Sequence, residues 1–188
     1  MKVSKYLLLR LTLLLFLFPS FLAAQDEKQK LTDPVVKGIV EQFVSMHYAQ
    51  KPLDDEMSAK IFKLYLNRLD PAHYYFLAAD VNEFQKYETR IDDMLLRGKV
   101  KLALEIFERF KVRLSERLAM MEEFLAEDFD FSRDANWTLE REDLPYPETT
   151  EEAREIWRTK IKFDLLTLKL ADTSIKDGKE RLMKRVRG

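Results

Sequence analysis

The sequence predicts an all-α protein: an irregular multi-helix bundle with one long helix and one extended, aromatic-rich connection. Three observations support this fold class. Only four glycines and six prolines interrupt the 188 residues, and 35% of the chain is charged. The long segments between prolines are rich in Leu, Glu, Lys and Arg, a composition that favours helices over sheets. Apolar residues recur every three or four positions through these segments, as they do on one face of a helix.

Residues 1–24 have the three-part pattern of a secretory signal peptide. A basic head precedes the apolar run 11–18, and small residues lead to Ala24, after which we expect cleavage. The alternative is a membrane anchor, but a spanning helix needs about 20 apolar residues and Arg10 interrupts this one. The chain has no cysteine, so we expect neither a lipid anchor nor disulfides. The sequence therefore predicts an exported, periplasmic protein without a stable membrane anchor.

The charge balance argues against nucleic acid as a partner. The signal segment holds three cations and no anions, so its removal changes the formal net charge from −1 to −4. A mildly acidic surface is not typical of nucleic-acid binding. The basic end 179–187 could touch an anionic membrane or nucleic acid, but five cations in nine residues are a weak pattern. We interpret this end as a solvated helix face.

Prolines and capping residues divide the first half into helices. Residues 25–33 are expected to form an exposed segment, and the helical domain to span 34–173. A cap followed by proline at 32–34 predicts a first helix that lasts to about Ala49. Asp54 is expected to cap a second helix, which Pro71 ends.

Two further helices are expected before the aromatic connection. Asp80 caps a helix whose apolar residues run at steps of three and four as far as Leu95, and Gly98 is a C-terminal stop signal. The longest segment runs from Lys99 to about Ala126. At 1.5 Å per residue this helix would be about 40 Å long, a length typical of a bundle or a bracing strut.

The C-terminal part begins with an extended connection at 129–147, which has no helical period. Thr149 and Glu152 form a predicted capping box for a helix that is apolar on two sides as far as Leu170. Alternation over 161–165 leaves a strand as the alternative there.

A further helix is predicted after Thr173, and its pattern is cut off at the end of the sequence. We therefore expect residues 174–188 to be the start of a longer, truncated helix. A helix with two apolar faces needs two neighbours, so we expect an exposed docking seam. Its predicted members are Phe163, Leu166, Leu170, Leu182 and Val186.

No motif in the chain predicts catalysis, a metal site or a cofactor. His47 and His73 have no second histidine four residues away, so the sequence predicts no zinc site. Acidic pairs lie at expected helix starts or on polar faces, where capping or solvation explains them. The sequence contains no Gly-rich phosphate loop and no Gly-x-Ser-x-Gly elbow. A serine–lysine pair stays open, although no motif supports one.

The stretch "LDPAHYYFLAAD" at 69–80 is unusual because four large apolar or aromatic residues follow one another in a turn. We expect Asp70 to cap or close this turn and Pro71 to fix its backbone. The aromatic residues would fill the seam between helices, since each buries roughly 150–250 Å². The predicted structural residues are Asp70, Pro71, Tyr74, Tyr75, Phe76, Leu77 and Asp80.

The same stretch, extended to "LDPAHYYFLAADVNEF", resembles the N-terminal region of tail-specific proteases, the carboxy-terminal processing peptidases of the serine–lysine type. The order "IFKLYLNRLDP", "RIDDMLLRGKV" and "LPYPETTEEAREIWRTKIKFDLLTLKLAD" continues the resemblance, which covers about residues 35–187. It implies an accessory domain that braces a PDZ domain and a protease core, with a periplasmic adaptor protein as a further partner. The residues that match carry no catalytic serine or lysine of the family.

Two hypotheses therefore stand side by side. In the first, the chain is the non-catalytic N-terminal structural domain of a periplasmic tail-specific protease. In the second, it is a free-standing exported helical adaptor or inhibitor. The DNA that follows codon 188 would discriminate them, because only the first predicts a continuation into PDZ sequence.

Overall fold

The computed structural model describes residues 33–46, 51–132 and 136–187, and this part of the chain contains helices and no strand. The all-α prediction is confirmed. The expected signal peptide and His47 lie outside the described residues. The helices are α2 (Asp33–Met46), α3 (Asp55–Leu69), α4 (Ala78–Gln85), α5 (Ile91–Leu96), α6 (Lys101–Ala126), α7 (Thr150–Leu170) and α8 (Ile175–Arg187).

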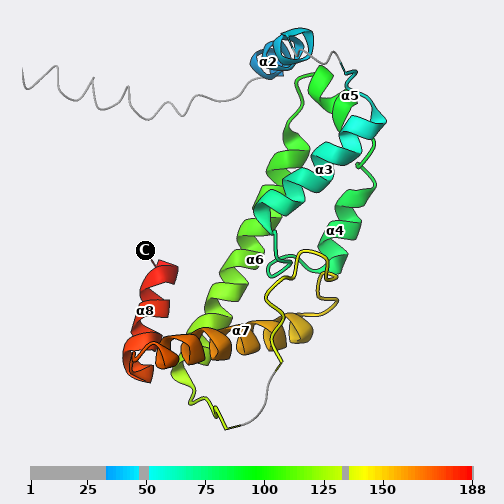
Figure 1. Ribbon diagram of the computed structural model, residues 1–188. Coiled ribbons are helices and arrows are strands. Elements are labelled where there is room, and N and C mark those ends of the chain that lie inside the picture. The colour runs from blue at the N-terminus through cyan, green and yellow to red at the C-terminus, as the bar shows by residue number, and fades with distance from the viewer. Residues whose placement is uncertain (1–32, 47–50, 133–135, 188) are drawn as a thin grey trace, which may run out of the picture.

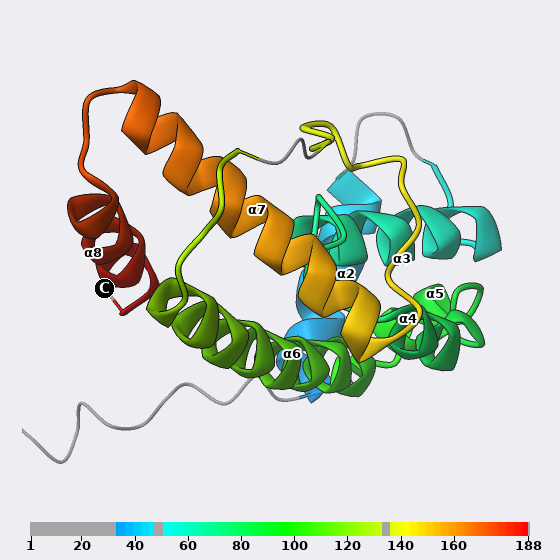
Figure 2. The ribbon, with the colours of Figure 1, turned by 90° about the horizontal axis from the view of Figure 1, so that it is seen from below.

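The long helix α6 is the spine of the molecule. Helices α2, α3 and α5 lie toward its N-terminal end, α4 lies beside its middle, and α7 and α8 pack at its C-terminal end (Figure 1). The view from below shows α7 crossing the spine and α8 lying beside the last turns of α6 (Figure 2). With 26 residues, α6 is about 39 Å long, so it links two groups of helices that are far apart.

Capping side chains begin α3 and α7 where the sequence predicts. The amide of Met57 donates to the Asp54 carboxylate at 2.9 Å, and the amide of Glu152 donates to Thr149 Oγ1 at 3.1 Å. The Glu152 carboxylate in turn accepts the amide of Glu148 at 2.8 Å. These bonds satisfy amides that have no partner within the helix.

The single helix expected from Asp80 to Leu95 is instead two helices, α4 and α5. Between them, amides bond to carbonyls three residues back, as in the 2.9 Å bond from Arg90 N to Tyr87 O. The first turn of α5 is anchored to α3 by Ser58. The hydroxyl of Ser58 donates to the Asp92 carboxylate at 2.7 Å and accepts the Asp92 amide at 2.8 Å. This contact bonds the start of α5 to α3. The apolar residues keep helical spacing through the break, which is why the sequence pattern missed it.

Two hydrophobic clusters share the spine. The α3–α4–α6 cluster surrounds one end of it, and the α6–α7–α8 cluster surrounds the other. The buried members of the first are Phe62, Leu66, Phe76, Phe84, Leu102 and Ile106. Those of the second are Met120, Met121, Phe124, Leu125, Trp157, Ile161, Leu165 and Leu182.

Helix α2 rests on the turn before α6. Gly98 has φ 74°, and a Cβ at this position would lie 1.9 Å from the carbonyl oxygen of Asp33. Lys99 forms an ion pair with the Asp33 carboxylate at the same contact. Glycine is therefore required here both by the left-handed backbone and by the close approach of α2.

Within residues 33–46, 51–132 and 136–187, no helix is both long and apolar enough to cross a lipid bilayer.

Candidate functional site: the turn that joins the two clusters

The segment between α3 and α4 lies between the two hydrophobic clusters. Tyr74 and Tyr75 pack against the α6–α7–α8 cluster, whereas Phe76 belongs to the α3–α4–α6 cluster and has no exposed surface. We call residues 70–80 the joint, because consecutive side chains of this segment enter both clusters.

The Asp70 carboxylate holds the backbone of the joint in shape. It accepts the amides of Tyr74 at 2.7 Å, Tyr75 at 2.8 Å and Phe76 at 3.0 Å. Asp70 also ends α3 through its own amide, which donates to the carbonyl of Leu66 at 2.8 Å. One fully buried side chain therefore satisfies three amides that no regular structure would satisfy.

The environment of Asp70 pulls its pKa in two directions. Burial raises the pKa above the ordinary value, because the charged form loses its water, and the three amide hydrogen bonds partly offset this rise. The carboxylate thus depends on the local backbone for its stabilisation. A change that separates the joint from Asp70 would leave a buried charge without donors, which is costly.

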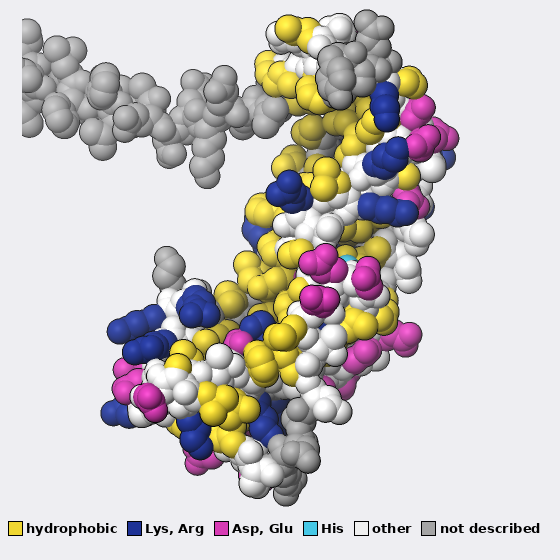
Figure 3. Space-filling view, viewed as in Figure 1, with side chains coloured by type: hydrophobic (Ala, Val, Ile, Leu, Met, Phe, Trp, Pro, Cys, Tyr) yellow, Lys and Arg dark blue, Asp and Glu magenta, His cyan; other side chains and the backbone are white. Residues whose placement is uncertain are grey.

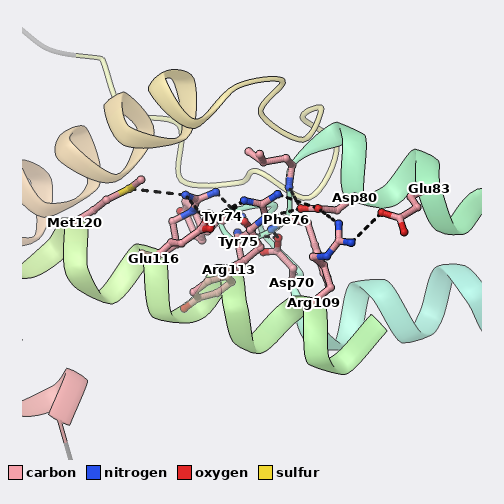
Figure 4. A network of polar contacts seen from close by, with 12 residues as sticks. Asp70, Tyr74, Tyr75, Phe76, Asp80, Glu83, Arg109, Arg113, Glu116 and Met120 are labelled. Atoms are coloured by element: carbon pink, nitrogen blue, oxygen red, sulfur yellow. Dashed lines mark hydrogen bonds and ion pairs between the residues drawn. The ribbon is translucent and has the colours of Figure 1, made fainter. Parts of the chain in front are cut away.

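The Asp80 carboxylate ties α4 to the spine (Figure 4). It accepts Arg113 Nε at 2.7 Å and Nη2 at 3.0 Å in a two-pronged pair, and Arg109 Nη1 at 2.6 Å. It also accepts the amide of Leu77 at 2.9 Å, which caps the start of α4. A fork-shaped arginine–carboxylate pair fixes both distance and orientation. The pair therefore sets how α4 lies on α6.

Opposite effects act on the pKa of Asp80. Burial alone would raise it, but hydrogen bonds from Arg113, the Leu77 amide and Arg109 together lower it below the ordinary value. The pKa of Arg113 is raised, first by its hydrogen bonds to Asp80. Both groups are charged at neutral pH, and each stabilises the charge of the other.

Arg117 is a charged side chain with no exposed surface. Its Nε donates to the carbonyl of Tyr74 at 3.3 Å, and its Nη2 donates to the carbonyl of Tyr75 at 3.0 Å. Trp157 Nε1, from α7, donates to the same Tyr74 carbonyl at 2.9 Å. Burial lowers the pKa of Arg117. The spine and α7 are therefore both bonded to the backbone of the joint.

The aromatic connection closes the joint from the outside. His73, which has φ 54°, stacks on Tyr146 at a ring separation of 3.8 Å and contacts the carbonyl of Leu144 through Nδ1. The amide of Ala78 donates to the carbonyl of Pro147 at 2.9 Å. Burial raises the pKa of Tyr146 to about 12. The connection is thus fixed to the joint by polar contacts as well as by packing.

The predicted turn residues differ in where the structure places them. Asp70, Phe76, Leu77 and Asp80 are buried, Tyr74 and Tyr75 are half-buried, and Pro71 is exposed. Asp80 lies inside α4, which begins two residues before the expected cap.

Sequence reasoning missed three arginines of α6 that bond to the joint: Arg109, Arg113 and Arg117. Their spacing of four places them on one edge of α6. Ile106, Met120 and Phe124 lie on the same edge and are buried. Arginines in phase with buried apolar residues are the signal that could have found them.

The predicted docking residues do not form one exposed seam. Leu182 is only 2% exposed and packs inside the α6–α7–α8 cluster, so its predicted exposure is wrong. Phe163 and Leu166 are half-buried, with Phe163 stacked on Trp137. Leu170 is 78% exposed. The side chain of Val186 lies outside the described residues. Leu182 is buried because α8 folds back onto α6 and α7.

The charged groups in and around the joint hold the fold together. The Asp70 and Asp80 carboxylates and the Arg117 guanidinium bond to backbone groups or to one another. In the described part of the chain, no three His, Asp or Glu side chains lie close enough together to hold a metal ion.

Comparison with known proteins identifies the family. Residues 39–188 match the family described as the tail specific protease N-terminal domain. The chain belongs to this family. A relative is the "Tail-specific protease" of Haemophilus influenzae (strain ATCC 51907 / DSM 11121 / KW20 / Rd), which is 32% identical over 164 residues. That match covers 87% of the chain but only 23% of the relative, so the chain spans about a quarter of the relative's length.

Proposed function

We propose that the chain is the non-catalytic N-terminal domain of a periplasmic tail-specific protease, and that it braces the PDZ domain and the proteolytic core. The family match over 39–188 and the far greater length of the Haemophilus relative support this assignment. The single structural observation that carries it is the joint, which binds both helical clusters to one 26-residue spine.

A domain that braces its neighbours has to be rigid, and the hydrogen bonds and ion pairs of the joint make it so. Asp80 is held by two arginines from the spine, and Arg117 reaches the backbone of the joint from the same helix. Buried polar networks in which each group has its partner favour one arrangement over others. The domain would therefore present its surfaces to a neighbouring domain at a fixed spacing.

Peptide hydrolysis by this domain alone is not part of the proposal. A serine–lysine enzyme needs a nucleophile, its base and an oxyanion hole within hydrogen-bonding reach of one another. The polar groups at the centre of this fold bond to backbone and to one another instead.

Export to the periplasm rests on the signal-peptide pattern at 1–24. N-terminal sequencing of the protein from a periplasmic fraction tests it, with Gln25 as the expected first residue. Purified protein that still begins at Met1 would contradict export with cleavage.

A chimaera tests the bracing role. In the Haemophilus relative, the segment that matches this chain is replaced by residues 33–187, and the baseline is the same relative with the segment deleted. Cleavage of a reporter that ends in an apolar C-terminus is measured for both. We expect the chimaera to cleave at least about tenfold faster than the deletion variant.

Two results would count against the proposal. A chimaera with native helix content but the activity of the deletion variant would refute bracing. Reporter hydrolysis by the purified 188-residue chain alone would refute the non-catalytic assignment. The match to one segment of a much longer protease favours this proposal over a free-standing adaptor or inhibitor, and the DNA that follows codon 188 discriminates the two.

A further inference from the structure

The spine carries a second apolar edge that differs from the one facing the joint. Along α6, positions alternate by three and four residues through three heptads, the spacing of a coiled-coil seam. We call this set the α6 seam; it consists of Leu104, Phe107, Lys111, Leu114, Leu118, Met121 and Leu125. Six of its seven members are apolar, and the seventh, Lys111, lies over the ring of Phe107 at 5.5 Å.

The α6 seam is covered at one end only. Met121 and Leu125 are buried in the α6–α7–α8 cluster, where Leu182 of α8 packs with them. Toward the N-terminal end of α6 the seam becomes more exposed to solvent. Leu118 and Leu114 are half-buried, and Leu104 is 58% exposed. Figure 3 shows apolar side chains along the edge of the spine on the side of α8.

Helix α8 leads toward the uncovered part. It contacts the C-terminal part of α6, and from there it runs antiparallel to α6, with its C-terminal end directed back toward the N-terminal half of the spine (Figure 1). Leu182 of α8 lies in the same hydrophobic cluster as Met121 and Leu125, so α8 covers the C-terminal part of the seam.

We infer that the α6 seam is the seat of a helix: the polypeptide that follows α8 in a full-length tail-specific protease, packed antiparallel to α6. This inference rests on the proposed function. Two observations favour this occupant over a second copy of the chain. The uncovered seam continues the existing α6–α8 interface, and the Haemophilus relative holds more than three-quarters of its length outside the matched segment.

The chemistry of the seam defines the partner helix. Leu104, Phe107, Leu114 and Leu118 need apolar side chains at heptad spacing opposite them. Lys111 is a single cation within this apolar row, and a polar residue at one such position fixes the register of two helices. Lys111 already pairs with Glu108 of the same helix at 2.8 Å, so the partner is an amphipathic helix with a polar residue, rather than a large apolar one, facing Lys111.

Cysteine labelling in the chimaera tests the seat, because this chain contains no cysteine of its own. Leu104→Cys places a thiol in the seam, and Val112→Cys is its matched control. The two parent side chains lie on the same helix and are 58% and 55% exposed, but Val112 points away from the seam. Maleimide labelling rates are measured at each site by peptide mass spectrometry, in the 188-residue chain and in the chimaera.

Both thiols should react at similar rates in the 188-residue chain. In the chimaera, Leu104→Cys should react at least about tenfold more slowly, and Val112→Cys should keep its rate. Equal rates at the two sites in the chimaera would overturn the inference. Protection of Leu104→Cys that appears in the 188-residue chain and grows with its concentration would overturn it too, in favour of a second copy.

Cleavage by the same chimaera separates this inference from the proposed function. A chimaera that cleaves the reporter while Leu104→Cys stays reactive would refute the seat and leave the bracing role intact. As a second readout, Leu104→Asp should slow reporter cleavage by at least about fivefold relative to Val112→Asp. Equal cleavage by these two variants would count against the seat even if labelling were incomplete.

Discussion

Arg117 shows how a single residue can be fixed by tertiary structure. The carbonyls of Tyr74 and Tyr75 lie in an irregular turn, outside the backbone hydrogen bonds of α3 and α4. A guanidinium offers several donors in one plane, so one side chain satisfies both carbonyls. Sequence statistics place arginine at the surface, and only the fold of the joint reveals why this one is buried.

Phe76 provides the stability test at the residue scale. Its ring is completely buried in the α3–α4–α6 cluster. Phe76→Ala should lower the free energy of unfolding by about 3–5 kcal/mol, through lost burial and the cavity that remains. Urea melts measure this loss. Phe107→Ala is the control: Phe107 is 40% exposed, so this variant should lose less free energy of unfolding. A loss below about 1 kcal/mol for Phe76→Ala would contradict the packing described here.

Asp80 should make stability depend on pH. Its pKa is lower in the folded state than in the unfolded state, so its contribution is fully present above about pH 4 and is lost as the pH falls through the folded value. Asp80→Asn should cost about 1.5–3 kcal/mol at pH 7, because charged hydrogen bonds are lost. The difference between wild type and variant should shrink at pH 3 in urea melts.

A matched variant separates the buried pair from a surface one. Asp93 pairs with Arg97 one turn away, and both side chains are well exposed. Asp93→Asn should change the free energy of unfolding by less than about 1 kcal/mol at either pH.

A pH-independent cost of Asp80→Asn would show that the shape of the Asp80 side chain, rather than its charge, explains the effect of the substitution.

At the scale of elements, local signals predicted the starts of α3 and α7, but not the start of α4 or the break between α4 and α5. Asp54 and Thr149 cap α3 and α7 as expected, because a capping bond depends on residues only three apart. The start of α5, just after the break from α4, is bonded to Ser58, which is 34 residues from Asp92. No local pattern reports such a contact, so the sequence predicted one helix there.

Gly98 offers a test of how α2 is seated. Gly98→Ala combines a left-handed backbone with a clash against the Asp33 carbonyl, so it should destabilise the protein by more than about 1 kcal/mol. Limited proteolysis should also cut within α2 sooner. Gly38→Ala is the control: its Cβ would meet nothing within 4 Å, and alanine should stabilise the helix by about 0.5–1 kcal/mol. Equal free energies of unfolding for the two variants would contradict this packing of α2 against Gly98.

At the scale of the whole molecule, the joint determines whether the two clusters behave as one body. The sequence predicted that the aromatic turn packs inward, but not that its consecutive residues enter different clusters. That division depends on how α7 crosses α6, which places Trp157 against Tyr74. Helix periodicity gives the apolar faces of α6 and α7 but not the angle at which they meet.

The joint should make the two clusters unfold together. Both tryptophans, Trp137 and Trp157, lie in the C-terminal part of the chain, whereas far-UV circular dichroism follows helices throughout. In the wild type, the two signals should melt together in urea, as expected for one cooperative unit. Asp70→Ala removes the acceptor of three joint amides and should separate the two midpoints. The control is Asp128→Ala, since that side chain is fully exposed. Separate transitions in the wild type would show that the joint does not couple the clusters.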